Sequence, residues 1–506
     1  MSEQKTIIKN PWTWVPTLYF AEGIPYIMVM SVSVMMYKNL GVSNTDIAFF
    51  TSLLYFPWFL KFAWSPFVDM FRTKRFWTIT MQLIIGVTLF AIAFRIQSSV
   101  YWNLTLIVFG LMAFASATHD IAADGFYMLG LKEDQQSAFV GVRSTFYRLA
   151  TIFGSGVLVV IAGELSKSIG VKTAWSSVFI FTGAMFILLF FFHKFILPHP
   201  ETDRGSLKDK RLSRAQILIL ATGFILFAGV VYLLFIFTVY LLAIFNVTSP
   251  WNTIVTTILL VILFVVLFRT FVAGFVSRFE KKENQNTALL PFIQFLKAFV
   301  IFMQKKDIWK ILSFLLFYRF AEAQLVKLVQ PFLIDPREKG GLGLSTSEVG
   351  IVYGTIGIIA LTLGGLIGGF VISKKGLKWW LWPMVLVMHI PDIAFVYLSH
   401  FQPANFILIN LAVAAEQFGY GFGFTAYMMY MIMISQGEHK TAHYAICTGI
   451  MALGMMLPGM YSGALQEQIG YKHFFEWVLL STIPGFVVAA LVKIDPFFGK
   501  KSDLNV

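Results

Sequence analysis

Apolar runs of roughly 20 residues recur along this sequence, and that is the length that crosses the hydrocarbon core of a bilayer. The chain has 506 residues, of which 58% are hydrophobic and only 13% are charged. A soluble protein of this size carries about 25% charged residues. Short alternating strands, which are typical of membrane β-barrels, are absent from the sequence. The sequence therefore predicts an all-α polytopic membrane protein.

Two short strings occur twice in the sequence at nearly the same offset. FAE at 20–22 returns at 320–322, 300 residues later, and LGVSNTD at 40–46 is echoed by LGLSTSE at 342–348, 302 residues later. The first string places a carboxylate inside an apolar stretch each time. Duplicated membrane halves around a central site are typical of secondary transporters. The alternative is a chance similarity between apolar helices.

The apolar runs predict six spans in the first half, at 12–37, 46–67, 76–97, 101–130, 137–165 and 173–196. Six more follow in the second half, at 308–334, 347–373, 378–400, 404–436, 441–466 and 473–494. Between the halves lie a polar segment, two further spans and an amphipathic interfacial helix, at 198–214, 215–246, 251–279 and 284–306. We therefore expect about 14 spans in three parts: a six-helix half at 1–197, a linker with a two-helix hairpin at 198–306 and a second six-helix half at 307–506.

Basic residues gather in alternate loops, at 72–75, 208–214, 281–282, 374–378 and 500–501. The loops between them carry far fewer Lys and Arg residues. Because cytoplasmic loops of membrane proteins are enriched in Lys and Arg, this pattern predicts that both termini are cytoplasmic. It also accounts for the net charge of +13, so we expect no nucleic-acid partner.

Several charged side chains fall inside the predicted spans, where each costs at least about 2.5 kcal/mol on insertion scales. In the first half they are Glu22, Lys61, His119, Asp120, Asp124, Arg143 and Arg148. In the second half they are Arg319, Glu322, Lys327, His389, Asp392 and Glu416. Except for His389 and Asp392, all lie in spans one, two, four or five of a half. We expect these spans to face a common aqueous cavity, and spans three and six to face lipid. The alternative is that the charges form structural ion pairs that hold the halves together.

The candidates for proton coupling are mid-membrane acids and one histidine, namely Glu22, Glu322, Asp120, Asp124 and His119. Arg148 is the candidate for binding a solute carboxylate, because a guanidinium binds a carboxylate through a planar fork. Further substrate candidates are Glu416, Arg319 and the aromatic residues Tyr19, Tyr26, Tyr147 and Tyr427, whose rings suit stacking on sugars. Lys61 belongs to the charge network at a depth similar to that of Asp120. Arg319 has an alternative role as the neutralising partner of Glu322, three residues later.

The sequence contains no catalytic set, metal-ligand cluster or phosphate-binding loop. We therefore expect no enzyme activity, no cofactor and no metal. The single cysteine, Cys447, excludes an internal disulfide.

The string KFAWSPFVD at 61–69 resembles permeases of the AmpG type in the major facilitator superfamily. Weaker matches are SATHDI at 116–121 with Asp124 following, YRL at 147–149 and TAHYA at 441–445. The resemblance covers most of both halves and implies the major facilitator fold, here with an inserted two-helix hairpin. Permeases of this type import anhydro-muropeptides from peptidoglycan turnover across the bacterial inner membrane, and acetyl-coenzyme A transporters belong to the same broad group.

The resemblance also implies a gating loop after span two, formed by Asp69, Arg72 and Arg75. One residue departs from the pattern of the family. The chain has His119 where the family leads us to expect Gln before the Asp of span four. Because histidine titrates near about pH 6.5, this change bears on proton coupling or on sugar recognition.

These features predict a monomeric secondary transporter that imports an anionic amino-sugar or muropeptide-type solute by proton symport through alternating access. Its expected partners are the small-molecule solute, protons and the lipid bilayer. The alternatives are a major facilitator transporter of another solute (a disaccharide, a drug or an acyl-nucleotide such as acetyl-coenzyme A), a lipid flippase and a membrane-embedded enzyme.

Overall fold

A computed structural model describes residues 10–70, 72–200, 203, 290–437 and 439–500 of the chain. Every regular element in that part is helical, and nine of its helices are long and apolar enough to cross a membrane. The predicted all-α polytopic fold is therefore confirmed. The spans expected at 215–246 and 251–279, and the start of the helix expected at 284–306, lie outside the described residues. The total of about 14 spans and the three-part division stay predictions.

The first half consists of helices joined by short turns. They are α1 (Val15–Ile27), the π-helical turn η2 (Met28–Val32), α2 (Ser33–Asn39), α3 (Asn44–Leu53), α4 (Phe56–Met70), α5 (Lys74–Arg95), α6 (Tyr101–Gly130), α7 (Glu133–Ile152), the π-helical turn η3 (Phe153–Leu158), α8 (Val159–Ile169) and α9 (Val171–Ile196). The ends of the predicted spans agree with these bounds to within about four residues, the usual uncertainty of a single sequence.

The second half repeats this pattern after α12 (Leu290–Met303). Its helices are α13 (Ile308–Phe317), α14 (Phe320–Ile334), α15 (Thr346–Val349), the π-helical turn η5 (Gly350–Gly357), α16 (Ile358–Lys375), α17 (Leu377–His389), the short 3₁₀ helix η6 (Ile390–Asp392), α18 (Ile393–Phe401), α19 (Phe406–Ser435), α20 (Lys440–Leu480) and α21 (Ile483–Leu491). Inside α20, Gly470 has a φ of 76°, which turns the chain between the last two predicted spans.

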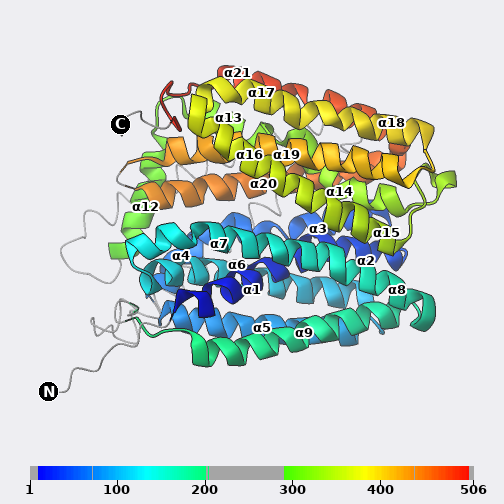
Figure 1. Cartoon of the computed structure of the whole chain (residues 1–506), viewed down its shortest axis with the longest axis horizontal. Helices are drawn as coiled ribbons and strands as arrows, with labels where there is room; N and C mark the ends of the chain where they lie inside the picture. The colour runs from blue at the N-terminus through cyan, green and yellow to red at the C-terminus, as the bar shows by residue number, and fades with distance from the viewer. Residues whose placement is uncertain (1–9, 71, 201–202, 204–289, 438, 501–506) are drawn as a thin grey trace.

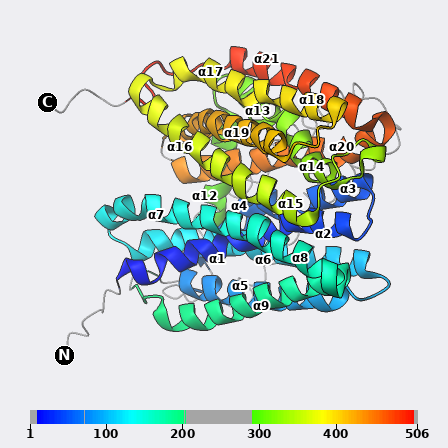
Figure 2. The same cartoon turned by 45° about the vertical axis from the view of Figure 1, so that its right-hand side comes forward.

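Figures 1 and 2 show the helices before residue 200 as one bundle and those after residue 307 as another, packed side by side. The two bundles meet where α3 packs against α20 and where α8 packs against α15. α12 lies at the end of the molecule where α1 begins and α16 ends (Figure 1). In both of these contacts, span two of one half packs against span five of the other half.

The repeated strings start equivalent helices in the two halves. The Ser43 side chain accepts a hydrogen bond from the Asp46 backbone N–H at 3.0 Å, at the start of α3. Ser345 accepts the same bond from Glu348 at 3.3 Å, at the start of α15. Such caps satisfy backbone donors that a helix start leaves free. The similarity of the strings thus has a structural cause, because each begins the second span of its half.

A polar network joins the two halves at the end that carries the loops at 40–43 and 335–345, which we call the closed end. Lys38 forms an ion pair with Asp335 across the halves, with Nζ 2.7 Å from Oδ1. The Asn44 amide donates to Gln466 Oε1 at 2.7 Å, and the Tyr471 hydroxyl donates to Asp335 Oδ2 at 2.7 Å. Most of these atoms are buried, so the network stabilises contact between the halves at this end.

Glycines allow the two halves to approach closely in two places, of which the first lies at the closed end. A Cβ added to Gly463 of α20 would lie 2.0 Å from the Asn44 carbonyl oxygen of α3. A Cβ added to Gly354 of η5 would lie 1.9 Å from the Ser155 carbonyl oxygen of η3. In both places only glycine permits the observed contact between backbones.

We expect Gly463→Ala to open the closed end, since the added methyl group must push α3 away from α20. Overpacking of this kind costs about 1–3 kcal/mol, so the closed arrangement should lose about tenfold or more in population. A cysteine introduced at Thr346 reports this change through its labelling by a membrane-impermeant maleimide. Gly369→Ala is the matched control, because a Cβ at Gly369 would meet nothing within 4 Å. Equal labelling of the two variants would show that this contact does not hold the end closed.

Candidate functional site

A cavity of about 530 Å³ lies between the two halves. Its walls come from spans one, two, four and five of each half, as the buried charges predicted, and not from α5, α9 or α17. The polar and aromatic residues that line it are Tyr19, Glu22, Tyr26, Ser31, Tyr55, Trp58, Lys61, Ser116, Asp120, Arg143, Ser144, Tyr147, Arg148, Thr151, Ser155, Arg319, Gln330, Tyr353, Gln417, Tyr420, Phe424 and Thr448.

The wall from the first half holds a cluster of acids and bases. Lys61 Nζ lies 2.7 Å from Asp120 Oδ2, and Arg143 pairs with Asp124 at 2.8 Å. Glu22 lies beside Asp120, close enough for the two carboxyl groups to share a hydrogen bond. Two carboxylates in contact repel each other unless one holds a proton. With three carboxyl groups and two bases, the cluster is neutral when it carries one proton.

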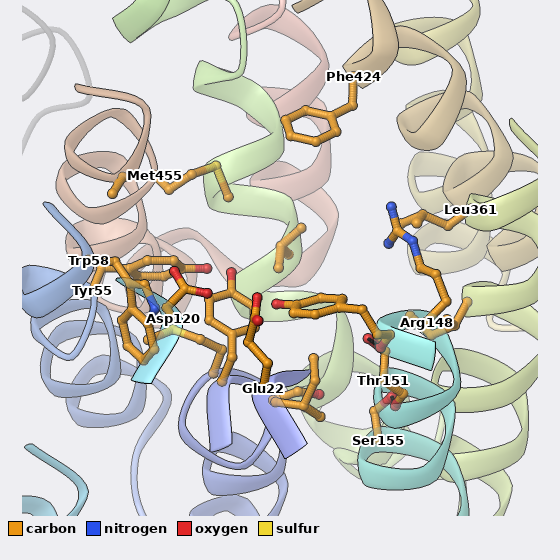
Figure 3. A pocket seen from close by; sticks show the side chains of 18 of the residues that line it. Glu22, Tyr55, Trp58, Asp120, Arg148, Thr151, Ser155, Leu361, Phe424 and Met455 are labelled. Carbon is orange, nitrogen blue, oxygen red and sulfur yellow. Dashed lines mark hydrogen bonds between the residues drawn. The ribbon is translucent and has the colours of Figure 1, made fainter. Parts of the chain in front are cut away.

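Arg148 lines the same cavity but lies apart from this cluster. It has no ion-pair or hydrogen-bond partner among the residues that the structure describes. Figure 3 shows its guanidinium pointing toward Leu361 of the second half, with Glu22 and Asp120 on the other side of the view. The Arg148 guanidinium therefore does not face Glu22, and its charge is free to meet a ligand.

Arg319, which precedes α14, provides a second guanidinium on the opposite wall. It stacks on the rings of Tyr420 and Phe424, with centroid distances of 5.0 and 4.7 Å, and donates a hydrogen bond to the Tyr420 hydroxyl. Its side chain is only 6% exposed, its Nε has no hydrogen-bond partner, and no carboxylate in the described part of the chain lies within ion-pair distance. The cavity thus has one unpaired guanidinium from each half.

Other predicted residues also line the cavity. Tyr26 packs edge-on against Trp58, with ring centroids 5.2 Å apart and an interplanar angle of 90°. The Tyr19 hydroxyl donates to Asp124 Oδ1 at 3.1 Å. The Arg143 guanidinium lies over the Tyr19 ring, with its Cζ 4.5 Å from the ring centroid. Asp124 itself is not among the lining residues, but its ion-pair partner Arg143 is one of them.

Three candidates lie behind the wall of the second half. Glu322 and Glu416 are 1% and 0% exposed, and neither is among the lining residues. Tyr427 is fully buried, donates its hydroxyl to the Leu315 carbonyl at 2.6 Å and stacks on Tyr318. Its ring is therefore part of the packing of this half and does not reach the cavity.

His119 also points away from the cavity. Its Nε2 lies 3.0 Å from the Gln82 amide nitrogen, and the Gln82 amide oxygen lies 2.9 Å from His193 Nδ1. His193 Nε2 in turn lies 2.9 Å from the Thr17 hydroxyl. The chain of buried polar groups ties α6 to α5, α9 and α1. The His119 ring therefore contributes to the packing of the first half, next to Asp120 in sequence.

The predicted gating loop lies at the opposite end from the closed end. Arg75 donates from Nε to the Leu197 carbonyl at 3.4 Å and also binds the Lys194 carbonyl, at the end of α9. Arg72 has a φ of 63° and lies over the Phe76 ring, 5.5 Å from its centroid. Asp69 lies in the last turn of α4. These contacts lie within the first half, and the gating role stays a prediction.

Sequence reasoning missed several lining residues. Arg143 counted only as a buried charge, although it lies four residues before Tyr147 on the same face of α7. Trp58 lies three residues before Lys61, and Tyr420 lies four after Glu416, which places each on the face that carries a charge. The spacing of three or four residues from a buried charge is the signal that points to them.

Comparison with known proteins identifies the family. The model of the Major Facilitator Superfamily matches residues 17–335, which is more than half of the chain. The chain belongs to the Major Facilitator Superfamily. It is therefore a multi-pass membrane transporter of a small-molecule solute, and not an enzyme.

Curated relatives of this superfamily member carry AmpG names, which confirms the resemblance drawn from the motifs. "Putative transporter AmpG 4" of Rickettsia conorii is 22% identical over 93% of this chain and 94% of the relative. "Putative transporter AmpG 2" of Rickettsia typhi is 26% identical over 39% of this chain and 47% of the relative. An uncharacterized protein of Haemophilus influenzae is 22% identical over 92% of this chain and 91% of its own length.

Solved structures of major facilitator transporters share the fold. The nucleoside transporter NupG, as its D323A mutant, matches with a TM-score of 0.62 at 14% identity over 96% of this chain and all of that one. The xylose transporter XylE from E. coli, in an inward open conformation, matches with a TM-score of 0.57 at 12% identity over 95% of this chain and 94% of its own. At these identities the likeness shows the fold alone.

Proposed function

We propose that this transporter imports an anionic amino-sugar or muropeptide-type solute across the bacterial inner membrane by proton symport. The observation that carries the proposal is the pair of guanidinium groups, Arg148 and Arg319, that face the cavity without a carboxylate partner. A buried charge without a partner is costly in a membrane protein. A solute carboxylate would supply the missing partner.

The arrangement of the cavity suits an amino-sugar that carries a carboxylate. Arg148 offers a planar fork with two parallel N–H donors, which matches a carboxylate. Tyr26, Trp58 and Tyr147 offer aromatic faces to a sugar ring. The Gln330 amide nitrogen donates to the Ser31 hydroxyl at 2.7 Å, which leaves the amide oxygen to accept from a sugar hydroxyl. The AmpG names of the relatives support the same class of solute.

The acid cluster of the first half supports proton coupling. The cluster contains three acids, Glu22, Asp120 and Asp124, and only two bases. It therefore becomes neutral when it binds one proton. Glu22 and Asp120 line the cavity and can exchange that proton with water that enters it. A proton that enters with the solute would leave on the side where the cavity opens next.

Alternating access follows from the contact between the halves. Both termini are proposed to be cytoplasmic, as the distribution of Lys and Arg residues predicts, so that the closed end faces outward. Import then requires the network around Asp335 to separate while the halves rock about the central cavity. Asp69, Arg72 and Arg75 are the proposed gating loop on the cytoplasmic side, and one chain forms a complete transport path.

A counterflow experiment tests the solute class. Proteoliposomes that contain the full-length protein are loaded with unlabelled anhydro-muropeptide, and entry of the labelled compound is measured against competitors. We expect carboxylate-bearing amino-sugars to compete, and a neutral disaccharide or a nucleoside to have no effect. Both classes of solute carry anionic groups, so the same assay is repeated with acetyl-coenzyme A. Counterflow of acetyl-coenzyme A without counterflow of anhydro-muropeptide would overturn the amino-sugar proposal in favour of an acyl-nucleotide transporter.

A further inference from the structure

A second group of buried acids lies in the second half, behind the wall of the cavity. Glu322 of α14, Asp392 of η6 and Glu416 of α19 interact electrostatically with one another. Each is at most 1% exposed. Glu322 Oε1, Glu416 Oε1 and both carboxyl oxygens of Asp392 have no hydrogen-bond partner. Buried polar atoms normally have partners, so this group requires an explanation.

His389 of α17 is an independent sign that the group binds a ligand. Its side chain is 3% exposed, and its Nδ1 lies 3.7 Å from Asp392 Oδ2. Neither ring nitrogen has a hydrogen-bond partner in the described structure. Gly485 of α21 and the ring of Phe486 enclose the imidazole on its other side. The histidine is therefore a buried titratable group that faces the acids.

The charges in this region do not balance. The charge of Arg319 acts on Glu322 from beyond ion-pair distance, and the neutral side chains of Tyr353 and Tyr420 face the two glutamates. Even when His389 carries a proton and Arg319 offsets one acid, one of the three carboxyl groups remains without a base. An uncompensated buried charge costs about 3–5 kcal/mol. The third acid therefore holds a proton.

A metal ion does not suit this group. In the part of the chain that the structure describes, no three His, Cys, Asp or Glu side chains converge closely enough to hold one. Buried carboxyl groups that do not converge on a metal ion can each still bind a proton. The ligand of the group is therefore a proton.

The group also has two routes to the cavity. The Gln417 amide lines the cavity and donates to Glu416 Oε2 at 2.9 Å. Arg319 lines the cavity and precedes Glu322 by three residues. When a solute anion binds Arg319, Glu322 loses the effect of its nearest positive charge, and holding a proton there becomes more favourable. Solute binding and proton binding would thus reinforce each other.

We infer that Glu322, Asp392, Glu416 and His389 form a second proton-binding site, so that a transport cycle carries a second proton in addition to the one at Glu22 and Asp120. The inference rests on the proposed symport function. It also gives each half of the transporter one proton-binding site. Each site consists of three carboxyl groups and two bases.

The ratio of protons to solute tests the inference. Proteoliposomes that contain the full-length protein are held at a fixed pH gradient and a series of membrane potentials, and the potential at which net anhydro-muropeptide flux stops gives the ratio. We expect about two protons per solute for the unchanged protein, and about one for Glu416→Gln and Asp392→Asn. Glu338→Gln is the control, because Glu338 is exposed in the turn after α14, and it should keep the ratio at about two.

The outcomes separate the inference from the proposed function. A ratio of about one in the unchanged protein, with uptake still driven by protons, overturns the second site and leaves the symport proposal intact. A ratio that stays at about two in both variants overturns it as well, because the acids would then be permanently protonated. Uptake that ignores the pH gradient overturns the symport proposal itself.

Infrared difference spectra provide a readout that does not depend on transport. We expect the purified protein to show a change in the stretching band of a buried protonated carboxyl group when anhydro-muropeptide binds, and we expect Glu416→Gln to reduce it. Glu416→Gln keeps the shape of the side chain, and its thermal stability shows whether it folds. A folded variant with an unchanged band would exclude Glu416 from the site.

Discussion

We expect Arg148→Lys to weaken binding of a carboxylate-bearing anhydro-muropeptide by about tenfold, because it keeps the charge and loses one charge-assisted hydrogen bond worth about 1.5 kcal/mol. The amide analogue of the same compound should bind both proteins almost equally, since it does not use the fork. Arg148→Ala removes the charge as well and should weaken binding further. Equilibrium binding to the purified protein measures each affinity.

Arg95→Lys is the control for this prediction, because Arg95 is an exposed guanidinium at the end of α5, outside the cavity. It should leave both affinities unchanged. If Arg148→Lys binds the carboxylate and the amide as the unchanged protein does, Arg148 does not contact the solute anion. The anionic-substrate proposal would then rest on Arg319 alone.

The second large effect is expected for Glu22→Gln. One unit of pH gradient supplies about 1.4 kcal/mol per proton, which sustains about a tenfold solute gradient for each proton coupled. Glu22→Gln removes one site of proton binding, so the solute gradient at steady state should fall by about tenfold for each unit of pH gradient. Exchange of labelled for unlabelled solute, which needs no net proton movement, should continue.

Accumulation and exchange are both measured in proteoliposomes. Glu338→Gln again serves as a control for the change from Glu to Gln at an exposed position. Loss of exchange together with accumulation would point to a solute-binding role for Glu22. Unchanged accumulation would exclude Glu22 as a proton carrier.

The sequence predicted the walls of the cavity well, for a physical reason. A charge is too costly to face lipid, so spans that carry buried charges must face water or one another. Glu22, Asp120 and Arg148 therefore marked spans of the first half correctly, and Arg319 and Glu416 did so for the second. The repeated strings marked equivalent helices because each contains a helix cap.

The sequence did not predict the direction in which single side chains point. The depth of a residue in a span follows from its position, but the rotation of the helix about its axis follows from packing. Glu322 matches Glu22 in sequence, yet it lies behind the wall while Glu22 lines the cavity. The sequence does not distinguish Tyr427 from the tyrosines that line the cavity. The structure does, because the Tyr427 hydroxyl donates to the Leu315 carbonyl inside the second half.

The sequence also did not show which charges are paired. Arg143 and Arg148 lie five residues apart on α7, and only Arg143 meets a carboxylate, at Asp124. That difference depends on α6, which brings Asp124 within reach of one guanidinium and not the other. A free charge is visible only once the neighbouring helix is in place, and it is this charge that points to an anionic solute.

Coupling of solute uptake to protons is the central claim, and uptake into proteoliposomes measures it most directly. Labelled anhydro-muropeptide is added to proteoliposomes of the full-length protein, with the outside more acidic than the inside. We predict accumulation above the outside concentration, and its collapse when a protonophore is added. Uptake that follows a sodium gradient and ignores the protonophore would contradict the account.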